Sequence, residues 1–149
     1  MNATISPTIA HPTQAKLPDS ASISHVTPIG LDVGNGAIKM YSGMGQTLME
    51  SYIHYLPERA THANLGYVEY LSGVRSDLIG KQWIGGLNAY FQSPSGVYRV
   101  TDSNEGKSEL CLQLLLSALT SLPYRKEWAL NLCASVHDGK VLVKLFVLL

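Results

Sequence analysis

The apolar segment NEGKSELCLQLLLSALTSLP, residues 104–123, constrains the fold more than any other part of the chain. At helical spacing its leucine, alanine and cysteine side chains cover most of the helix surface. They leave only a narrow polar stripe, formed by Glu109, Gln113, Ser117 and Thr120. Pro123 ends this helix, because proline lacks the amide proton that a helix needs. So wide an apolar surface has to pack against a sheet, and the segment therefore predicts an α/β fold with one long helix across a sheet.

The strands of that sheet are expected on both sides of the helix in the sequence. The stretch IGLDVGNGAIKMY predicts a β-hairpin with strands at 29–33 and 37–41 and a tight turn at 34–36. Further strands are predicted at 48–55, 67–71, 78–84 and 128–136. The sheet is expected to be mixed, to be mostly antiparallel and to begin with the hairpin.

Composition bounds the domain organisation and the partners. Residues 1–27 are rich in Ser, Thr, Pro and Ala without a regular period, so we expect a disordered tail followed by one domain at 28–149. Eleven basic residues balance eleven acidic ones, which disfavours direct nucleic-acid binding. The C-terminal run VLVKLFVLL is shorter than the roughly 20 residues of a membrane helix, and no secretion signal is recognisable. A cytoplasmic location without membrane association is expected.

The cysteine and histidine residues do not suggest a metal site. Cys111 and Cys133 lie inside apolar runs rather than in a CxxC pair, so both are expected to be buried, reduced thiols. His54, His62 and His137 are scattered without the spacing of metal ligands. We expect them to have no role in metal binding.

The hairpin turn carries residues that suit a phosphate ligand. The motif GxxxxGK[ST] is absent, and the third glycine of GxGxxG would fall on Lys39. In an Asn-Gly turn with positive φ at both residues, the amides of Gly34, Asn35 and Gly36 gather on one side and bind an anion. Lys39 can reach the same anion, and Asp32 can hold a hydrated Mg²⁺. The alternative is an ordinary hairpin with a lysine and an aspartate on its surface.

The motif LDVGNGAIK resembles the first phosphate loop of the actin-like ATPases, in the form shared by actins and by the plasmid-partition ParM/StbA group. It is also similar, more loosely, to the loop of sugar kinases and heat-shock chaperones. The order of VEYLSG, WIGGLNAY, the leucine-rich helix and SVHD extends the likeness to ParM/StbA over about residues 29–140. The resemblance implies an actin-like (ribonuclease-H-like) N-terminal subdomain.

The resemblance also implies ligands, site residues and partners. The expected cofactors are ATP and Mg²⁺. Asp32 would lie near Mg²⁺, Lys39 would bind phosphate, and Gly34, Asn35 and Gly36 would form the loop on the β- and γ-phosphates. Intact members of the family polymerise with ATP and move plasmid DNA through an adaptor, so self-association or a filament partner is expected.

Other parts of an actin-like ATPase are missing from the sequence. There is no DxGxxT second phosphate loop, no glycine-rich adenosine segment and no candidate for the residue that positions the attacking water. We therefore predict no catalytic residue and little or no hydrolysis by this chain alone. The alternative function is a non-enzymatic interaction or adaptor domain that keeps the actin-like sheet.

The C-terminal sequence suggests a truncated ATPase. In similar proteins the residues after HDGKV run Phe-Gly-Glu-Ala-Leu, whereas this chain has Leu-Val-Lys-Leu. Loss of one T from the codons for Val-Phe-Gly-Glu-Ala-Leu gives Val-Leu-Val-Lys-Leu, so a frameshifted fragment is one hypothesis. The other is that KVLVKLFVLL is a genuine closing strand.

Overall fold

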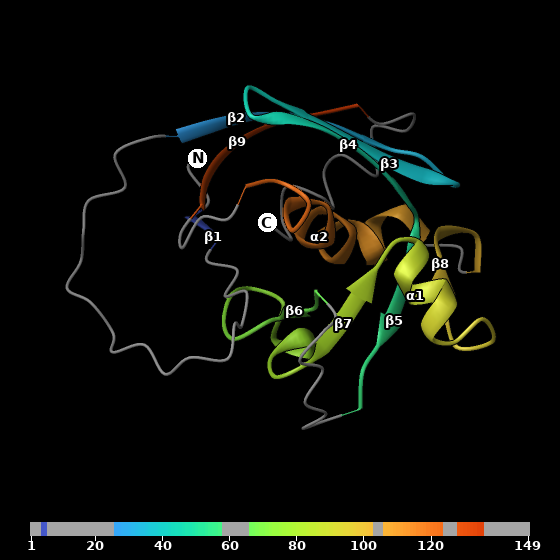
Figure 1. Cartoon of the computed structure of the whole chain (residues 1–149). Helices are drawn as coiled ribbons and strands as arrows, with labels where there is room; N and C mark the ends of the chain where they lie inside the picture. Colours follow the sequence, from blue (N-terminus) through green and yellow to red (C-terminus); the bar gives the residue numbers. More distant parts are fainter. Residues whose placement is uncertain (1–3, 6–25, 58–65, 103–105, 124–127, 136–149) are drawn as a thin grey trace.

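A computed structural model describes residues 4–5, 26–57, 66–102, 106–123 and 128–135. The described residues form two β-sheets with one long helix between them, as Figure 1 shows. In spatial order, sheet A contains β1 (Thr4–Ile5), β9 (Trp128–Ser135), β2 (Val26–Val33), β3 (Ala37–Ser42) and β4 (Gly45–Glu50). Sheet B contains β6 (Val68–Glu69), β7 (Gln82–Gly85), β5 (Tyr52–Tyr55) and β8 (Tyr98–Arg99).

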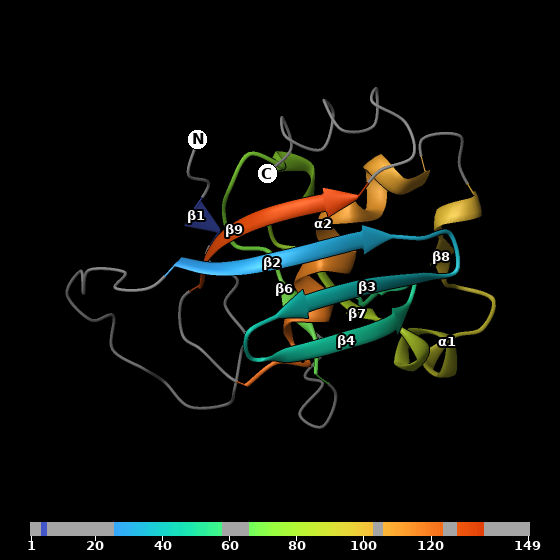
Figure 2. The same cartoon turned by 90° about the horizontal axis from the view of Figure 1, so that it is seen from above.

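Sheet A is the mixed sheet that the sequence predicts. Strands β2, β3 and β4 pair antiparallel in sequence order, which confirms the hairpin. Strand β9 comes last in the chain but pairs parallel to β2, with Ile29 opposite Leu132 (Figure 2). Between β4 and β9 the chain builds sheet B and then the helix α2 (Gly106–Leu119). The order and direction of these strands confirm the α/β class.

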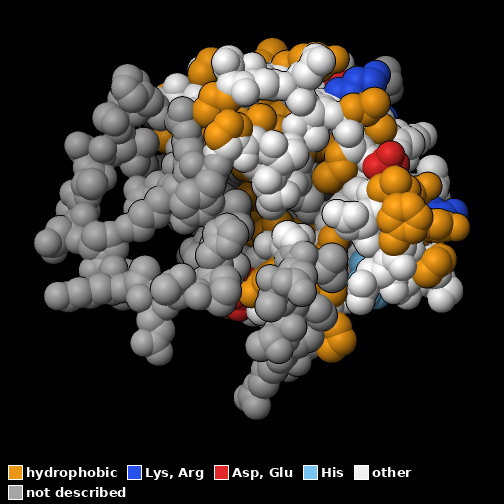
Figure 3. Space-filling model, in the orientation of Figure 1, with side chains coloured by type: hydrophobic (Ala, Val, Ile, Leu, Met, Phe, Trp, Pro, Cys, Tyr) orange, Lys and Arg blue, Asp and Glu red, His pale blue; other side chains and the backbone are white. Residues whose placement is uncertain are grey.

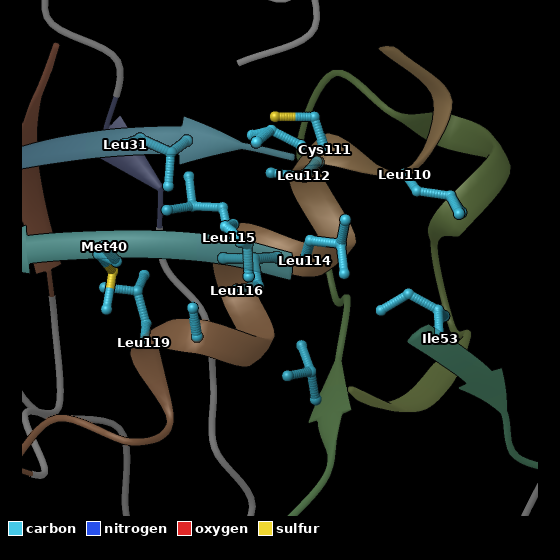
Figure 4. Close-up of a cluster of buried hydrophobic side chains, with 14 of the residues drawn as sticks. Leu31, Met40, Ile53, Leu110, Cys111, Leu112, Leu114, Leu115, Leu116 and Leu119 are labelled. Atoms are coloured by element: carbon cyan, nitrogen blue, oxygen red, sulfur yellow. The ribbon is translucent and has the colours of Figure 1, made fainter. Parts of the chain in front are cut away.

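Helix α2 is buried on nearly all sides because it packs between the two sheets. Twelve of its fourteen residues are buried. Leu31 and Met40 of sheet A lie against one side of the helix and Ile53 of sheet B approaches another (Figure 4). The sequence predicts one sheet against this helix, and the structure adds the second.

Two of the four residues of the predicted polar stripe, Gln113 and Ser117, face sheet B, whereas Glu109 and Thr120 are exposed. Gln113 and Ser117 are both buried. The indole Nε1 of Trp83 donates to the Gln113 carbonyl oxygen and to Ser117 Oγ, both at 3.2 Å. Gln113 Nε2 donates to the Tyr55 hydroxyl at 2.9 Å. These hydrogen bonds fix how sheet B lies on the helix, since buried polar groups need partners.

Several predicted boundaries differ from the structure. The single strand expected at 48–55 is divided into β4 and β5 at Ser51. The expected strand at 78–84 starts later, at Gln82, after a short 3-10 helix η1 (Ser76–Leu78). Between β7 and α2 the chain forms helix α1 (Leu87–Gln92), strand β8 and a 3-10 helix η2 (Val100–Asp102), none of which the sequence predicts. These elements are too short to give a clear sequence period.

The two ends of the chain are described only in part. Strand β2 begins at Val26, two residues before the expected start of the domain. Thr4–Ile5 pairs with β9 as β1 and so differs from the expected tail, whereas 1–3 and 6–25 lie outside the described residues. The alternatives for the C-terminal run also lie outside them, at 136–149. In the described part of the chain, no helix is long and apolar enough to cross a membrane.

The two cysteines lie in different environments. Cys111 is buried in α2, and this burial raises the pKa of its thiol to about 12. Cys133 is exposed, so the prediction that both thiols are buried is wrong for this residue. Its side chain belongs to the face of β9 that points away from α2, and the apolar run around it does not reveal which face it takes.

Substitution of Gly85 tests how tightly sheet B packs on α2. A Cβ atom at this position would overlap the side chain of Ser117 and would lie 3.4 Å from Met49 Cε. We expect Gly85→Ala to lower the free energy of unfolding by about 1–3 kcal/mol, the usual cost of overpacking a filled core. Urea unfolding followed by circular dichroism measures the change.

Gly43→Ala, in the turn between β3 and β4, is the matched control. A Cβ atom built at Gly43 has no neighbouring atom within 4 Å. Equal stability of the two variants would contradict close packing of sheet B on the helix.

Candidate functional site

The two charged residues predicted for the site lie side by side on the hairpin. Asp32 on β2 is directly opposite Lys39 on β3. The neighbouring side chains Leu31, Val33, Ile38 and Met40 are buried in the core around α2. Because side chains alternate along a strand, Asp32 and Lys39 point to the outer face of sheet A, away from the helix. The structure therefore brings these two predicted residues together.

Asp32 and Lys39 form an exposed ion pair. Lys39 Nζ lies 3.4 Å from Asp32 Oδ2, and the side chains are 50% and 39% exposed. An exposed pair of this kind contributes only about 0–1 kcal/mol to stability. A ligand that carries its own negative charge can thus compete for the lysine at little cost. In Figure 3, positive and negative side chains lie near one another at the edge of the described surface.

The turn at Gly34–Gly36, called the 34–36 loop below, is closed by its own backbone. The Gly34 N–H donates to the Ala37 carbonyl oxygen at 2.9 Å. A Cβ atom on Gly34 would lie 2.7 Å from that oxygen, so the close approach requires glycine here. One of the three amides expected to bind an anion is consequently already paired.

The remaining amides of the loop are those of Asn35 and Gly36. Within the described residues, neither amide donates a hydrogen bond to the protein. A Cβ atom built on Gly36 would meet nothing within 4 Å, so the space beside it is open. Gly36 does not have a positive φ angle. The prediction of positive φ at both Asn35 and Gly36 is therefore wrong for Gly36. The predicted anion site is therefore reduced to two amides and the Lys39 ammonium.

Ser51 donates two hydrogen bonds to the carbonyl groups of the 34–36 loop. Its Oγ donates to the Gly34 carbonyl oxygen at 2.9 Å, and its N–H donates to the Gly36 carbonyl oxygen at 3.0 Å. Ser51 is completely buried and stands where the chain leaves β4 of sheet A and enters β5 of sheet B. These hydrogen bonds direct the Gly34 and Gly36 carbonyl oxygens toward the buried Ser51.

Sequence reasoning missed this residue because Leu48–Tyr55 was expected to be one strand. The sequence contains only a weak indication that Ser51 contacts the 34–36 loop. Ser51 is the one serine in the segment LMESYIHY, and it lies seventeen positions after Gly34.

Asp32 is the carboxylate that stands beside Lys39 and could hold a magnesium ion. Mg²⁺ is usually held by one or two carboxylates together with substrate phosphates and water, so Asp32 fits as a single protein ligand. No group of three or more His, Cys, Asp or Glu residues lies together in the described ranges. The donor set suits a metal that arrives with a phosphate ligand.

The outer face of sheet A continues beyond the ion pair. A shallow hollow of about 380 Å³ lies over Gly30, between Tyr41 and Cys133. Neither Asp32 nor Lys39 lines it. Tyr41 is 54% exposed, and Leu48, directly opposite Lys39 on β4, is 72% exposed. This face carries apolar side chains beside the charged pair.

Removing the hydroxyl of Ser51 tests how the 34–36 loop is held. We expect Ser51→Ala to lower the free energy of unfolding by about 1–2 kcal/mol, because the partly buried Gly34 carbonyl loses its donor. Amide hydrogen exchange at Gly34 and at residue 51, whose N–H groups donate to the Ala37 and Gly36 carbonyl oxygens, should become faster at the same time. Ser72→Ala, at an exposed serine, is the control. Unchanged exchange in Ser51→Ala would show that the hydroxyl does not hold the loop.

Comparison with known proteins gives the fold but no sequence relative. No protein-family model and no curated protein matches the sequence. Among solved structures, the chain is similar to one described as the crystal structure of the apo psk41 parM protein, with a TM-score of 0.56 and 15% sequence identity. The match covers 84% of this chain and 42% of that protein, so this chain spans less than half of its length. The likeness confirms the predicted fold: the chain has a ParM-like, actin-like fold.

Proposed function

We propose that this chain is the phosphate-binding lobe of a ParM/StbA-like actin-like ATPase and binds ATP with Mg²⁺. The observation that carries the proposal is the Asp32–Lys39 pair beside a loop with two unengaged amides. The actin-like fold supports it, because the DxGxGxxK motif then stands on the hairpin of sheet A. Action in the cytoplasm and association with further copies or a filament partner belong to the same proposal.

Each residue has a separate task in this proposal. The amides of Asn35 and Gly36 donate to phosphate oxygens, and the Lys39 ammonium leaves Asp32 to neutralise phosphate charge. The Asp32 carboxylate, freed from the lysine, would hold the metal ion. Mg²⁺, when bound there, would supply positive charge that neutralises the phosphates.

Hydrolysis by this chain alone is expected to be weak or absent. Rate enhancement of phosphoryl transfer comes from positioning and from charge stabilisation around the whole phosphate group. The hairpin contacts the phosphates from one side, and the sequence has no DxGxxT motif for the other. The chain therefore serves as a nucleotide-binding lobe rather than as a complete enzyme.

A second candidate function rests on the outer face of sheet A. Tyr41 and Leu48 are large apolar residues that are more than half exposed there. A chain that uses this face for a protein partner, without a nucleotide, would be an interaction or adaptor domain. In that case Lys39 would have no special role.

Titration of Mg²⁺–ATP into the full chain separates the two functions. We expect saturable binding to wild-type protein by calorimetry, and binding about ten- to a hundredfold weaker to Lys39→Ala. A hydrogen bond to a charged group contributes roughly 1.5–3 kcal/mol, which corresponds to this range.

Leu48→Ala is the matched control, since it changes the residue opposite Lys39 without changing charge. It should bind like the wild type. Equal affinity of Lys39→Ala and wild type, or no binding by either, would refute the proposed nucleotide site.

A further inference from the structure

Strand β9 brings a third polar side chain to the row formed by Asp32 and Lys39. Ser135 is the last residue of β9, and it is directly opposite Asp32 in the parallel pairing of β9 with β2. Asp32 is in turn directly opposite Lys39 on β3. The three residues therefore occupy neighbouring positions on three adjacent strands. Ser135 lies outside the motif that contains Asp32 and Lys39, on a strand that comes much later in the chain.

The side chain of Ser135 belongs to the outer face of sheet A. Ala134, which precedes it, packs against the core around α2. Because side chains alternate along a strand, Ser135 points away from the helix, to the face that carries Asp32. Cys133 agrees with this direction, since it is exposed and lines the hollow over Gly30 on the outer face. Ser135 is itself exposed, so a ligand on this face can reach it.

The hydroxyl of Ser135 is available to a ligand that also contacts Asp32. It makes no hydrogen bond with any other described residue, whereas the Asp32 carboxylate is paired with Lys39. Paired strands lie about 4.7–4.9 Å apart, so side chains at opposite positions on one face can contact the same small group. A hydroxyl and a carboxylate at this separation can bind one hydrated ion.

The carboxyl ends of β2 and β9 meet at one edge of sheet A. The two strands are parallel, and their arrows point to the same end of the sheet in Figure 2. The 34–36 loop follows β2 directly, so it lies at this edge as well. Open α/β sheets bind their ligands outside the carboxyl ends of the strands. Ser135 is therefore at the end of β9 where a ligand of the 34–36 loop would lie.

We propose that Ser135 is a further binding residue of this site and contacts the metal ion, or its bound water, of a Mg²⁺–polyphosphate. The inference rests on the proposed function and assigns the two sides of the site. The order Ser135, Asp32, Lys39 across the sheet puts the hydroxyl beside the carboxylate and away from the ammonium. Mg²⁺ prefers oxygen ligands, and P-loop proteins likewise use a serine or threonine hydroxyl on this ion.

Calorimetric titration of ATP into the full chain, once with excess Mg²⁺ and once with EDTA, tests this assignment. We expect Ser135→Ala to weaken the binding of Mg²⁺–ATP about three- to tenfold, the loss that corresponds to one hydrogen bond. The binding of metal-free ATP should stay as in the wild type. Lys39→Ala, in contrast, should weaken binding both with and without Mg²⁺, because the ammonium contacts phosphate.

Two further variants serve as controls. Asn131 is another exposed polar residue of β9, and it is opposite Pro28 instead of Asp32. Asn131→Ala should therefore bind ATP like the wild type under both conditions. Ser135→Thr keeps the hydroxyl and should retain most of the affinity for Mg²⁺–ATP. Circular dichroism of each variant checks that the fold is unchanged.

Two outcomes would overturn this inference and leave the proposed function intact. The first is equal affinity of Ser135→Ala and wild type for Mg²⁺–ATP. The second is an equal loss of affinity with and without Mg²⁺, which would separate the hydroxyl from the metal. Failure of the proposed function has a different result, because wild-type protein would then bind no ATP under either condition.

Discussion

Burial of α2 between two sheets is the constraint on which the rest of the structure depends. A helix with twelve buried residues out of fourteen needs apolar partners on opposite sides, and one sheet cannot provide them. Sheet B therefore has to close over the face that carries Gln113 and Ser117. Trp83 and Tyr55 supply the hydrogen bonds that make this burial possible. The same arrangement leaves the Gln113 Oε1 atom buried, without a hydrogen-bond partner among the described residues.

The same packing positions the phosphate-binding candidate. Strands β2 and β3 direct alternate side chains at α2, so Asp32 and Lys39 are fixed on the opposite face at neighbouring positions. Ser51 then ties the 34–36 loop to the point where the chain passes from sheet A to sheet B. The backbone of the candidate site is thus held by regular elements and by the Ser51 hydrogen bond, so that the Asp32–Lys39 ion pair is the part that has to rearrange when a ligand binds.

Local patterns in the sequence were sufficient for the hairpin, for α2 and for β9, because each has a clear period or a strong turn signal. The sequence predicted strands over β5, β6 and most of β7 but did not show that they form a second sheet, and β8 was missed because no period can be read from two residues. The role of Ser51 depends on a contact across seventeen residues, which no local pattern contains. Cys133 was misplaced because an apolar run of residues does not say which face of a strand is covered. In the candidate site, the sequence could place Asp32 and Lys39 on the two strands of one hairpin. It could not show that the two residues are directly opposite each other or that the Gly34 amide is already paired with the Ala37 carbonyl oxygen.

The most direct measurement is a crystal structure of the full chain with Mg²⁺ and a non-hydrolysable ATP analogue. The account predicts phosphate oxygens within hydrogen-bonding distance of the Asn35 and Gly36 amides and of Lys39 Nζ. The Lys39–Asp32 pair should be opened, with the metal on the side of Asp32. A nucleotide bound elsewhere on the chain, with Lys39 still paired to Asp32, would contradict it.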